Sequence, residues 1–266
     1  MTTPIAVTVA GSDSGGGAGI QADLKTFSAL GVYGASVVTA VTAQNTHGVT
    51  AVHEVPAAVV TAQMDAVFSD LAANAVKIGM LASVPVIEAV AAGLDRHRQS
   101  AVVLDPVMVA TSGDRLLAPG AVDAMQRELL PRAVVVTPNL PEAAALLGVE
   151  VADDDTAMVR QGRLLLERGA RAVLVKGGHG RGHESIDVLV TPAGTIRVQG
   201  PRIATRNTHG SGCTLSAGIA AGLAKGLDLE DALREAKAYV TGAIAAAGRL
   251  AVGTGSGPLH HFHRWW

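Results

Sequence analysis

Short runs that are apolar at nearly every position alternate with helical patterns along the whole chain of 266 residues. Such runs are typical of strands covered on both faces, as in parallel sheets. The expected strands are 5–10, 36–42, 75–78, 101–104, 133–136, 172–175 and 187–190. A chain with this spacing is expected to build βαβ units, because a helix can cross over between neighbouring parallel strands.

Helical patterns are expected over 18–30, 57–73, 84–97, 119–130, 140–148, 155–168, 212–225 and 229–248. Strands and helices that alternate along a whole chain form one sheet with helices on both sides. No proline- and serine-rich linker and no solenoid-like repeat interrupts the pattern. We therefore predict an α/β fold, a doubly wound and mostly parallel sheet flanked by helices on both faces, in a single domain over 1–266.

Charge and composition exclude two classes of partner. The net charge is −2 and no stretch is a dense Lys/Arg block, so we expect no nucleic-acid binding. Residues 26–53 carry no ionised side chain, but their glycines, threonines, Gln44 and Asn45 do not suit a lipid bilayer, so we expect no membrane segment. A single cysteine and a start without a signal-peptide pattern favour a cytoplasmic location.

Polar residues and glycines follow the expected strands. In a doubly wound sheet, ligands bind beyond the carboxyl ends of the strands. At these positions the sequence has "AGSDSGGGAG", "TAQNTHG", Gly79-Met80, "DPVM", "TPNLPE" and "KGGHG". One edge of the sheet is therefore expected to gather Asp, Gln, Asn, Glu, Lys and Gly, which favours a small-molecule site over a purely structural role.

Two glycine-rich segments, 11–19 and 208–213, each lead into an expected helix. Free amides at a helix N-terminus attract anions, helped by the helix dipole. Neither segment has the spacing of a Walker A loop or of the dinucleotide fingerprint. A glycine-rich turn can also be a tight strand-to-helix connection, and that alternative stays open.

Cys213, the only cysteine, lies in the second glycine segment at the start of the expected helix. A helix N-terminus lowers the pKa of a thiol and so raises its thiolate fraction. A free cysteine more commonly packs as a small apolar residue. Its place among the glycines favours a base or a nucleophile over packing.

The chain resembles the hydroxymethylpyrimidine and phosphomethylpyrimidine kinases of thiamine biosynthesis, in the ribokinase-like superfamily. The resemblance runs nearly from end to end. The matching stretches are "AGSDSGGGAGIQADLKT", "TAVTAQNTHGV", "KIGML", "VVLDPVMVATSGDRLL", "TPNLPEA", "VLVKGGH", "NTHGSGCTLSAGIAAGLAKG" and "PLHHFH". It implies a ribokinase-like fold, ATP as phosphoryl donor, Mg²⁺ and a homodimer.

The resemblance also implies roles in phosphoryl transfer. Cys213 would be the base that takes the proton of the substrate hydroxymethyl group. The anion hole for the transferring phosphoryl group would be formed by the amides of Gly210, Ser211, Gly212 and Cys213. Nucleotide and metal positions would be Lys176 and Thr208 at the phosphates, and Asn139, Glu142 and Asp105 around Mg²⁺.

For the pyrimidine, the implied pocket consists of Asp23, Gln44, Met80 and Val107. A glutamine amide carries a donor and an acceptor side by side, which complements the amino group and ring nitrogen of an aminopyrimidine. Met80 has a simpler alternative as core filler. A buried amide such as that of Gln44 is harder to explain without a partner.

Other implied site residues have structural alternatives too. Asp105 before Pro106 could end a strand in a turn. Asn139 and Glu142 have the spacing of a capping box, which is compatible with a metal role. Lys176 could be a solvated strand end. The histidines 260, 261 and 263 near the chain end are expected to lie in a packed tail and to bind no metal.

We therefore expect an ATP-dependent kinase that phosphorylates 4-amino-5-hydroxymethyl-2-methylpyrimidine and then its monophosphate. A pyridoxal kinase on the same scaffold is the alternative within this chemistry. A non-catalytic nucleotide- or vitamin-binding regulator is the alternative from another class. Residues 108–117, with Thr, Ser and Gly before the next helical pattern, are expected to form a mobile flap over the site.

Overall fold

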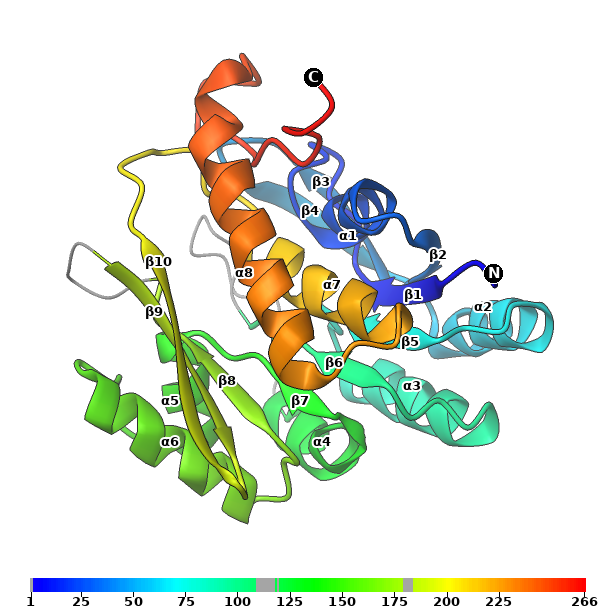
Figure 1. Cartoon of the computed structure of the whole chain (residues 1–266). Helices are drawn as coiled ribbons and strands as arrows, with labels where there is room; N and C mark the ends of the chain where they lie inside the picture. The colour runs from blue at the N-terminus through cyan, green and yellow to red at the C-terminus, as the bar shows by residue number, and fades with distance from the viewer. Residues whose placement is uncertain (1, 109–117, 119, 179–183) are drawn as a thin grey trace.

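The computed structural model describes residues 2–108, 118, 120–178 and 184–266. Its main sheet has eight strands in the order β10-β9-β8-β7-β6-β5-β1-β2 (Figure 1). Their bounds are β1 Ile5–Ala10, β2 Tyr33–Val38, β5 Ala75–Ile78, β6 Val102–Leu104, β7 Val135–Val136, β8 Val173–Lys176, β9 Glu184–Thr191 and β10 Gly194–Pro201. Within this sheet β1, β2, β5, β6, β7 and β8 run parallel, whereas β9 and β10 add an antiparallel hairpin at one edge.

The helices cover both faces of this sheet. They are α1 Gly19–Ala29, α2 Ala57–Asp70, α3 Val84–Arg96, α4 Ala121–Glu128, α5 Leu140–Leu147, α6 Asp155–Glu167, α7 Ser211–Ala224 and α8 Leu229–Ala246, with 3₁₀ turns at Leu130–Arg132 and Ala247–Arg249. Helices α7 and α8 lie side by side in front of the sheet in Figure 1. No helix in the described residues is long and apolar enough to span a membrane.

Alternating strand residues build two cores. In β6, Val102 and Leu104 face one side and pack among residues of α2 to α6, while Val103 faces α1, α7 and α8. All three side chains are fully buried. Successive side chains of a strand point to opposite faces, so a strand buried on both faces is apolar at most of its positions. This explains the uninterrupted apolar runs and confirms the doubly wound fold expected from the sequence.

One expected strand, 36–42, is wrong as a single element. The chain leaves the main sheet after Val38, and Ala40–Gln44 forms β3, which pairs with β4 at Val49–Glu54 in a separate two-stranded ribbon. The division falls at Thr39, whose hydroxyl donates to the Met80 carbonyl oxygen at 2.8 Å. A continuous β-branched run gives no sign of this change of sheet.

Strands β4 and β10 were not expected from the sequence. Most side chains of β4 are exposed, and β10 alternates apolar and polar residues at the edge of the sheet. Neither has the uninterrupted apolar run by which the other strands were recognised. The flap expected at 108–117 falls outside the described residues except for Met108, which is buried.

Candidate active site

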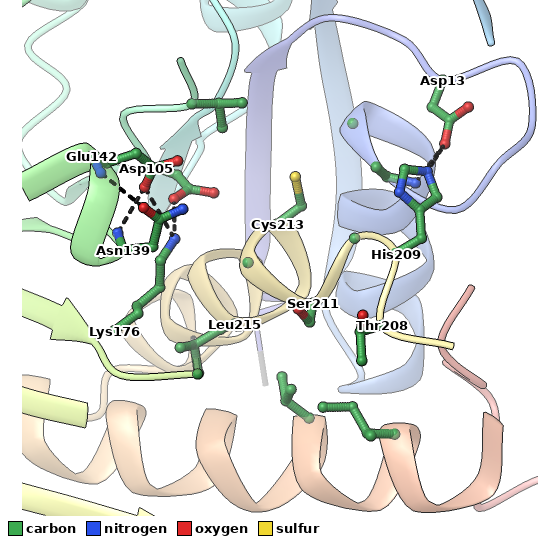
Figure 2. Close-up of a pocket in the computed structure, with 18 of the residues that line it drawn as sticks. Asp13, Asp105, Asn139, Glu142, Lys176, Thr208, His209, Ser211, Cys213 and Leu215 are labelled. Atoms are coloured by element: carbon green, nitrogen blue, oxygen red, sulfur yellow. Dashed lines mark hydrogen bonds and ion pairs between the residues drawn. The ribbon is translucent and has the colours of Figure 1, made fainter. Parts of the chain in front are cut away.

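A cavity of about 930 Å³ lies beyond the carboxyl ends of β1, β5, β6 and β8, where the polar residues of the sequence were expected to gather. It is the size of a small-molecule site. Figure 2 shows Cys213 between two polar groups, with the Asp105 cluster on one side and the Asp13–His209 pair on the other. The cavity brings together twelve of the thirteen residues expected at the site, which are Gln44, Met80, Asp105, Val107, Asn139, Glu142, Lys176, Thr208, Gly210, Ser211, Gly212 and Cys213.

The two glycine loops meet backbone to backbone beside Cys213. Gly210 is the N-cap of α7 and has a φ of 81°, a left-handed conformation that favours glycine. A Cβ atom at Gly210 would lie 1.9 Å from the carbonyl oxygen of Gly17 in the first loop. Only a residue without a side chain allows this approach, so the glycines hold the N-termini of α1 and α7 at one point.

The amides at the start of α7 are not equivalent. The Ser211 N–H donates to the Thr208 carbonyl oxygen at 3.1 Å, within the turn. For the Gly212 and Cys213 N–H groups, the described part of the chain offers no acceptor. Unpaired amides at a helix N-terminus are ready donors to an anion. Of the four amides expected in the anion hole, these two and that of Gly210, which also has no acceptor in the described residues, are therefore available as donors.

Cys213 is partly exposed at this junction. Burial raises the pKa of its thiol to about 11, against the opposing influence of the Lys77 ammonium group and a hydrogen bond from the Gly19 amide. The pKa lowered by the helix N-terminus, as expected from the sequence, is therefore not found, because burial acts more strongly than the Lys77 ammonium group and the Gly19 amide. A nearby cation is therefore needed to favour the thiolate form of Cys213.

A buried cation and two carboxylates form the second polar group, on the left of Figure 2. The Lys176 ammonium lies 2.7 Å from Asp105 and 3.8 Å from Glu142. Although burial acts against it, Lys176 and then Lys77 hold the pKa of Asp105 below its ordinary value. Burial raises the pKa of Glu142 to about 7. Lys176 is thus a paired, buried residue, not a solvated strand end.

Asn139 and Glu142 form a capping box at the start of α5. The Asn139 side chain accepts from the Glu142 N–H at 2.8 Å, and the Glu142 carboxylate accepts from the Asn139 N–H at 2.7 Å. The structural alternative weighed for this motif is therefore present. Both residues also line the cavity, so the cap fixes the Glu142 carboxylate next to Lys176.

Gln44, Met80 and Val107 line another part of the cavity. Met80 and Val107 belong to a small apolar cluster with Ala40 and Ala82. The Gln44 amide oxygen lies 3.1 Å from the Thr42 hydroxyl, and its nitrogen lies 3.5 Å from His209 Nε2. An apolar wall beside an oriented amide suits a flat heteroaromatic ring with a polar edge.

Asp23 is the expected substrate residue that the cavity does not include. Its side chain is fully buried, where it accepts from Lys77 at 2.8 Å and from the Thr8 hydroxyl at 2.6 Å. Lys77 lines the cavity in its place. The expectation that Asp23 lines the pyrimidine pocket is therefore wrong, because Lys77 lies at the cavity wall and Asp23 is bonded to it.

Sequence reasoning missed Lys77 and the Asp13–His209 pair. Lys77 is a charged residue within a buried strand, and such a residue signals a partner, because a lone buried charge is very unfavourable. The Asp13 carboxylate lies 2.8 Å from His209 Nε2 and also accepts from the Gly17 and Ala18 amides. This pair links the first glycine loop to the second.

The geometry has counterparts among known proteins. The structure of Bacillus subtilis pyridoxal kinase in complex with ADP superposes with a TM-score of 0.89 at 34% identity, covering 98% of each chain. The chain is thus a ribokinase-like small-molecule kinase in fold.

Sequence comparison places it within that class. The hydroxymethylpyrimidine/phosphomethylpyrimidine kinase of Rhizobium meliloti is 62% identical over 99% of both chains. The thiamine biosynthesis bifunctional protein ThiED of Geobacter sulfurreducens is 51% identical over 96% of this chain and 51% of its own length. The phosphomethylpyrimidine kinase family matches residues 13–260, and the chain belongs to that family.

Proposed function

We propose that this chain transfers the γ-phosphoryl group of ATP to the hydroxymethyl oxygen of 4-amino-5-hydroxymethyl-2-methylpyrimidine, and then phosphorylates the monophosphate to the diphosphate used in thiamine biosynthesis. The observation that carries the proposal is one cavity lined by Gln44 and the apolar wall, by Lys176 and two carboxylates, and by Cys213 with unpaired helix amides. Cys213 lies between the Lys176 group and His209 in Figure 2, and the Gln44 amide nitrogen lies 3.5 Å from His209 Nε2. This arrangement suits a phosphoryl acceptor near Gln44, a nucleotide near Lys176, and transfer of the phosphoryl group at Cys213.

In the transfer step, the substrate hydroxyl oxygen attacks the γ-phosphorus and its proton passes to the Cys213 thiolate, which becomes a neutral thiol. The bond from phosphorus to the bridging oxygen breaks, and ADP leaves with that oxygen. The Gly212 and Cys213 N–H groups donate to the charged phosphoryl oxygens. Phosphoryl transfer depends mainly on such positioning and charge stabilisation.

Mg²⁺ is proposed to bind between the nucleotide phosphates and the two carboxylates of Asp105 and Glu142. The described residues contain no cluster of three or more His, Cys, Asp or Glu that could hold a metal alone. Two hard oxygen ligands beside a phosphate suit Mg²⁺, which keeps several waters. The raised pKa of Glu142 means that its buried carboxylate would be stabilised by a further bound cation. When bound, the ion neutralises charge on the phosphates.

A pyridoxal kinase shares the fold at 34% identity, but the relative at 62% identity is a pyrimidine kinase, which favours the pyrimidine. The choice is proposed to depend on Gln44. Pyridoxal has a phenolic oxygen and an aldehyde where the pyrimidine has an amino group beside a ring nitrogen. A site that hydrogen-bonds a polar edge rejects an analogue that lacks it, because its own groups stay unpaired. A non-catalytic regulator would have no need of Cys213 among anion-binding amides.

Gln44→Met tests this choice. We expect transition-state binding of the pyrimidine to weaken by about 1–3 kcal/mol, the usual effect of unmade buried hydrogen bonds. The kcat/KM for pyridoxal should fall little or should rise. The measurement is kcat/KM for both substrates, with Gln99→Met as a matched control, since the Gln99 amide donates to the His97 carbonyl away from the cavity. Equal losses for both substrates would contradict the assignment.

A homodimer is proposed through the β3–β4 ribbon. Val41 is 50% exposed and Val52 is 45% exposed, and they lie on opposite faces of the ribbon. The first glycine loop is hydrogen-bonded to the ribbon at Ala40 and Thr42, and a second copy would cover apolar surface that this contact leaves exposed. Light scattering after size exclusion should give twice the chain mass, and Val41→Glu with Val52→Glu should give the monomer. A monomeric wild type would reject this interface.

The remaining parts of the proposal concern the whole chain. The eight-stranded sheet is continuous from β10 to β2, which supports one domain over 1–266. A base that must stay reduced supports the expected cytoplasmic location, because disulfides are rare there.

A further inference from the structure

Lys77 is a charged residue in the middle of the main sheet. It lies on β5, and its side chain is fully buried. Its ammonium donates to Asp23 Oδ2 at 2.8 Å, and the Thr8 hydroxyl donates to the same oxygen. Asp23 Oδ1 is buried without a hydrogen-bond partner in the described residues. A buried ion pair contributes little net stability and is unfavourable unless well bonded, so its retention calls for another explanation.

Lys77 is also one of the residues at the wall of the cavity. It lines the cavity together with Cys213 and Asp105. A Cβ atom at Gly79 would lie 2.7 Å from Lys77 Nζ, so the glycine leaves space for the cation at the carboxyl end of β5. An ammonium has three N–H donors. Asp23 takes one of them, and the described residues supply no second hydrogen-bond acceptor.

The charged groups around the Cys213 sulfur come from four elements. Lys77 on β5 is the foremost influence favouring the thiolate, while Asp23 on α1 and Asp105 after β6 oppose it. Lys176 on β8 interacts with the same thiol. The amide of Gly19 on α1 adds a hydrogen bond. Lys77 is thus the principal cation acting on a thiol whose burial strongly disfavours ionisation.

We propose that Lys77 is a positioning residue of the phosphoryl-transfer reaction, which stabilises the Cys213 thiolate, and that Asp23 holds the lysine in place and moderates its charge. The catalytic meaning rests on the proposed role of Cys213 as base. In the reaction, the thiolate accepts the proton of the substrate hydroxyl, so a neutral thiol replaces the anion next to the ammonium. A larger thiolate fraction at neutral pH provides more of the active base.

The single cysteine makes a direct test possible, since a thiol reagent reports on Cys213 alone. Iodoacetamide is neutral and reacts with the thiolate, forming a thioether and releasing iodide. Its rate measured against pH therefore follows the ionisation of Cys213, with no substrate or nucleotide present. Circular dichroism and denaturant midpoints establish that each variant is folded.

The two partners of the ion pair should act in opposite directions. Lys77→Met removes a cation and should slow alkylation at neutral pH by about tenfold or more, which is one pKa unit. Asp23→Asn removes an anion and should speed it by about threefold or more. The double variant, with neither charge, should return to within about threefold of the wild type. Both single variants break the same contact, so general loosening of the site would move them the same way.

Comparing the wild type, the two single variants and the double variant also keeps the test valid if one variant does not fold. The effect of Lys77 is the difference between wild type and Lys77→Met, or between Asp23→Asn and the double variant. Removing both charges leaves no unpaired buried ion, so the double variant is the best tolerated. The proposal would be overturned if Lys77→Met left the alkylation rate unchanged, either in the wild type or in Asp23→Asn. It would also be overturned if both single variants changed the rate in the same direction.

Turnover of the same variants separates this inference from the proposed function. Lys77→Met should lower kcat in the pyrimidine assay in step with the fall in alkylation rate. If alkylation follows the charges while Cys213→Ala retains turnover, the electrostatic role of Lys77 stands and the assignment of the base is wrong. If alkylation ignores Lys77 while Cys213→Ala is inactive, the base assignment stands and the inference about Lys77 is wrong.

Discussion

Replacing Cys213 by alanine is expected to leave ATP binding nearly intact and to lower kcat by about a hundredfold or more, the usual effect of losing a general base. The side chain lies at the junction of two helix N-termini, between the candidate acceptor and donor groups. Calorimetric ATP titration and steady-state kinetics measure the two effects separately. Near-normal turnover of the alanine variant would mean that Cys213 only packs.

Cys213→Ser is the matched variant, because it preserves the shape of the side chain. A hydroxyl has a much higher pKa than a thiol, so we expect it to be badly impaired too. Since burial raises the pKa of the Cys213 thiol to about 11, wild-type kcat/KM should rise with pH through the neutral range as thiolate forms. The alanine variant should lose that dependence.

Lys176→Met is expected to lower both stability and activity. It removes the cation that lies 2.7 Å from Asp105 and 3.8 Å from Glu142. Removing one partner from a buried pair leaves an uncompensated charge and destabilises by about 3–5 kcal/mol. Denaturant unfolding measures this loss, and the KM for ATP measures the loss of phosphate binding.

A second substitution separates the two effects of Lys176. Asp105→Asn added to Lys176→Met removes the stranded carboxylate, so it should recover most of the free energy of unfolding. The double variant should not recover turnover, because the proposed nucleotide site then lacks both the Lys176 cation and the candidate metal ligand Asp105. Wild-type stability in the single Lys176→Met variant would show that the cation does not balance these carboxylates.

The positions of the site residues along the sheet edge could be predicted from the sequence because strand ends are marked by a change from apolar to polar residues. Asp105 and Lys176 follow or end such runs and lie together in the structure. Asn139 and Glu142 were recognisable through their spacing, which is that of a capping box. These local signals place residues at an edge without giving their contacts.

Contacts between distant elements could not be predicted in this way. Asp23 and Lys77 are 54 positions apart, and nothing near either residue identifies the other as its partner. The thiol pKa also depends on burial, which at Cys213 outweighs the Lys77 ammonium group and the Gly19 amide. Thr39, where the chain leaves the main sheet, is hydrogen-bonded to Met80, 41 positions away. Tertiary context decides each of these features.

The most direct test of the central claim is the kcat/KM of the wild-type protein for three phosphoryl acceptors, measured side by side with ATP and Mg²⁺. These acceptors are the aminopyrimidine alcohol, its monophosphate and pyridoxal. Gln44 in the cavity predicts that both pyrimidines are phosphorylated and that each is preferred to pyridoxal. A preference for pyridoxal, or no turnover of either pyrimidine, would contradict the proposed function.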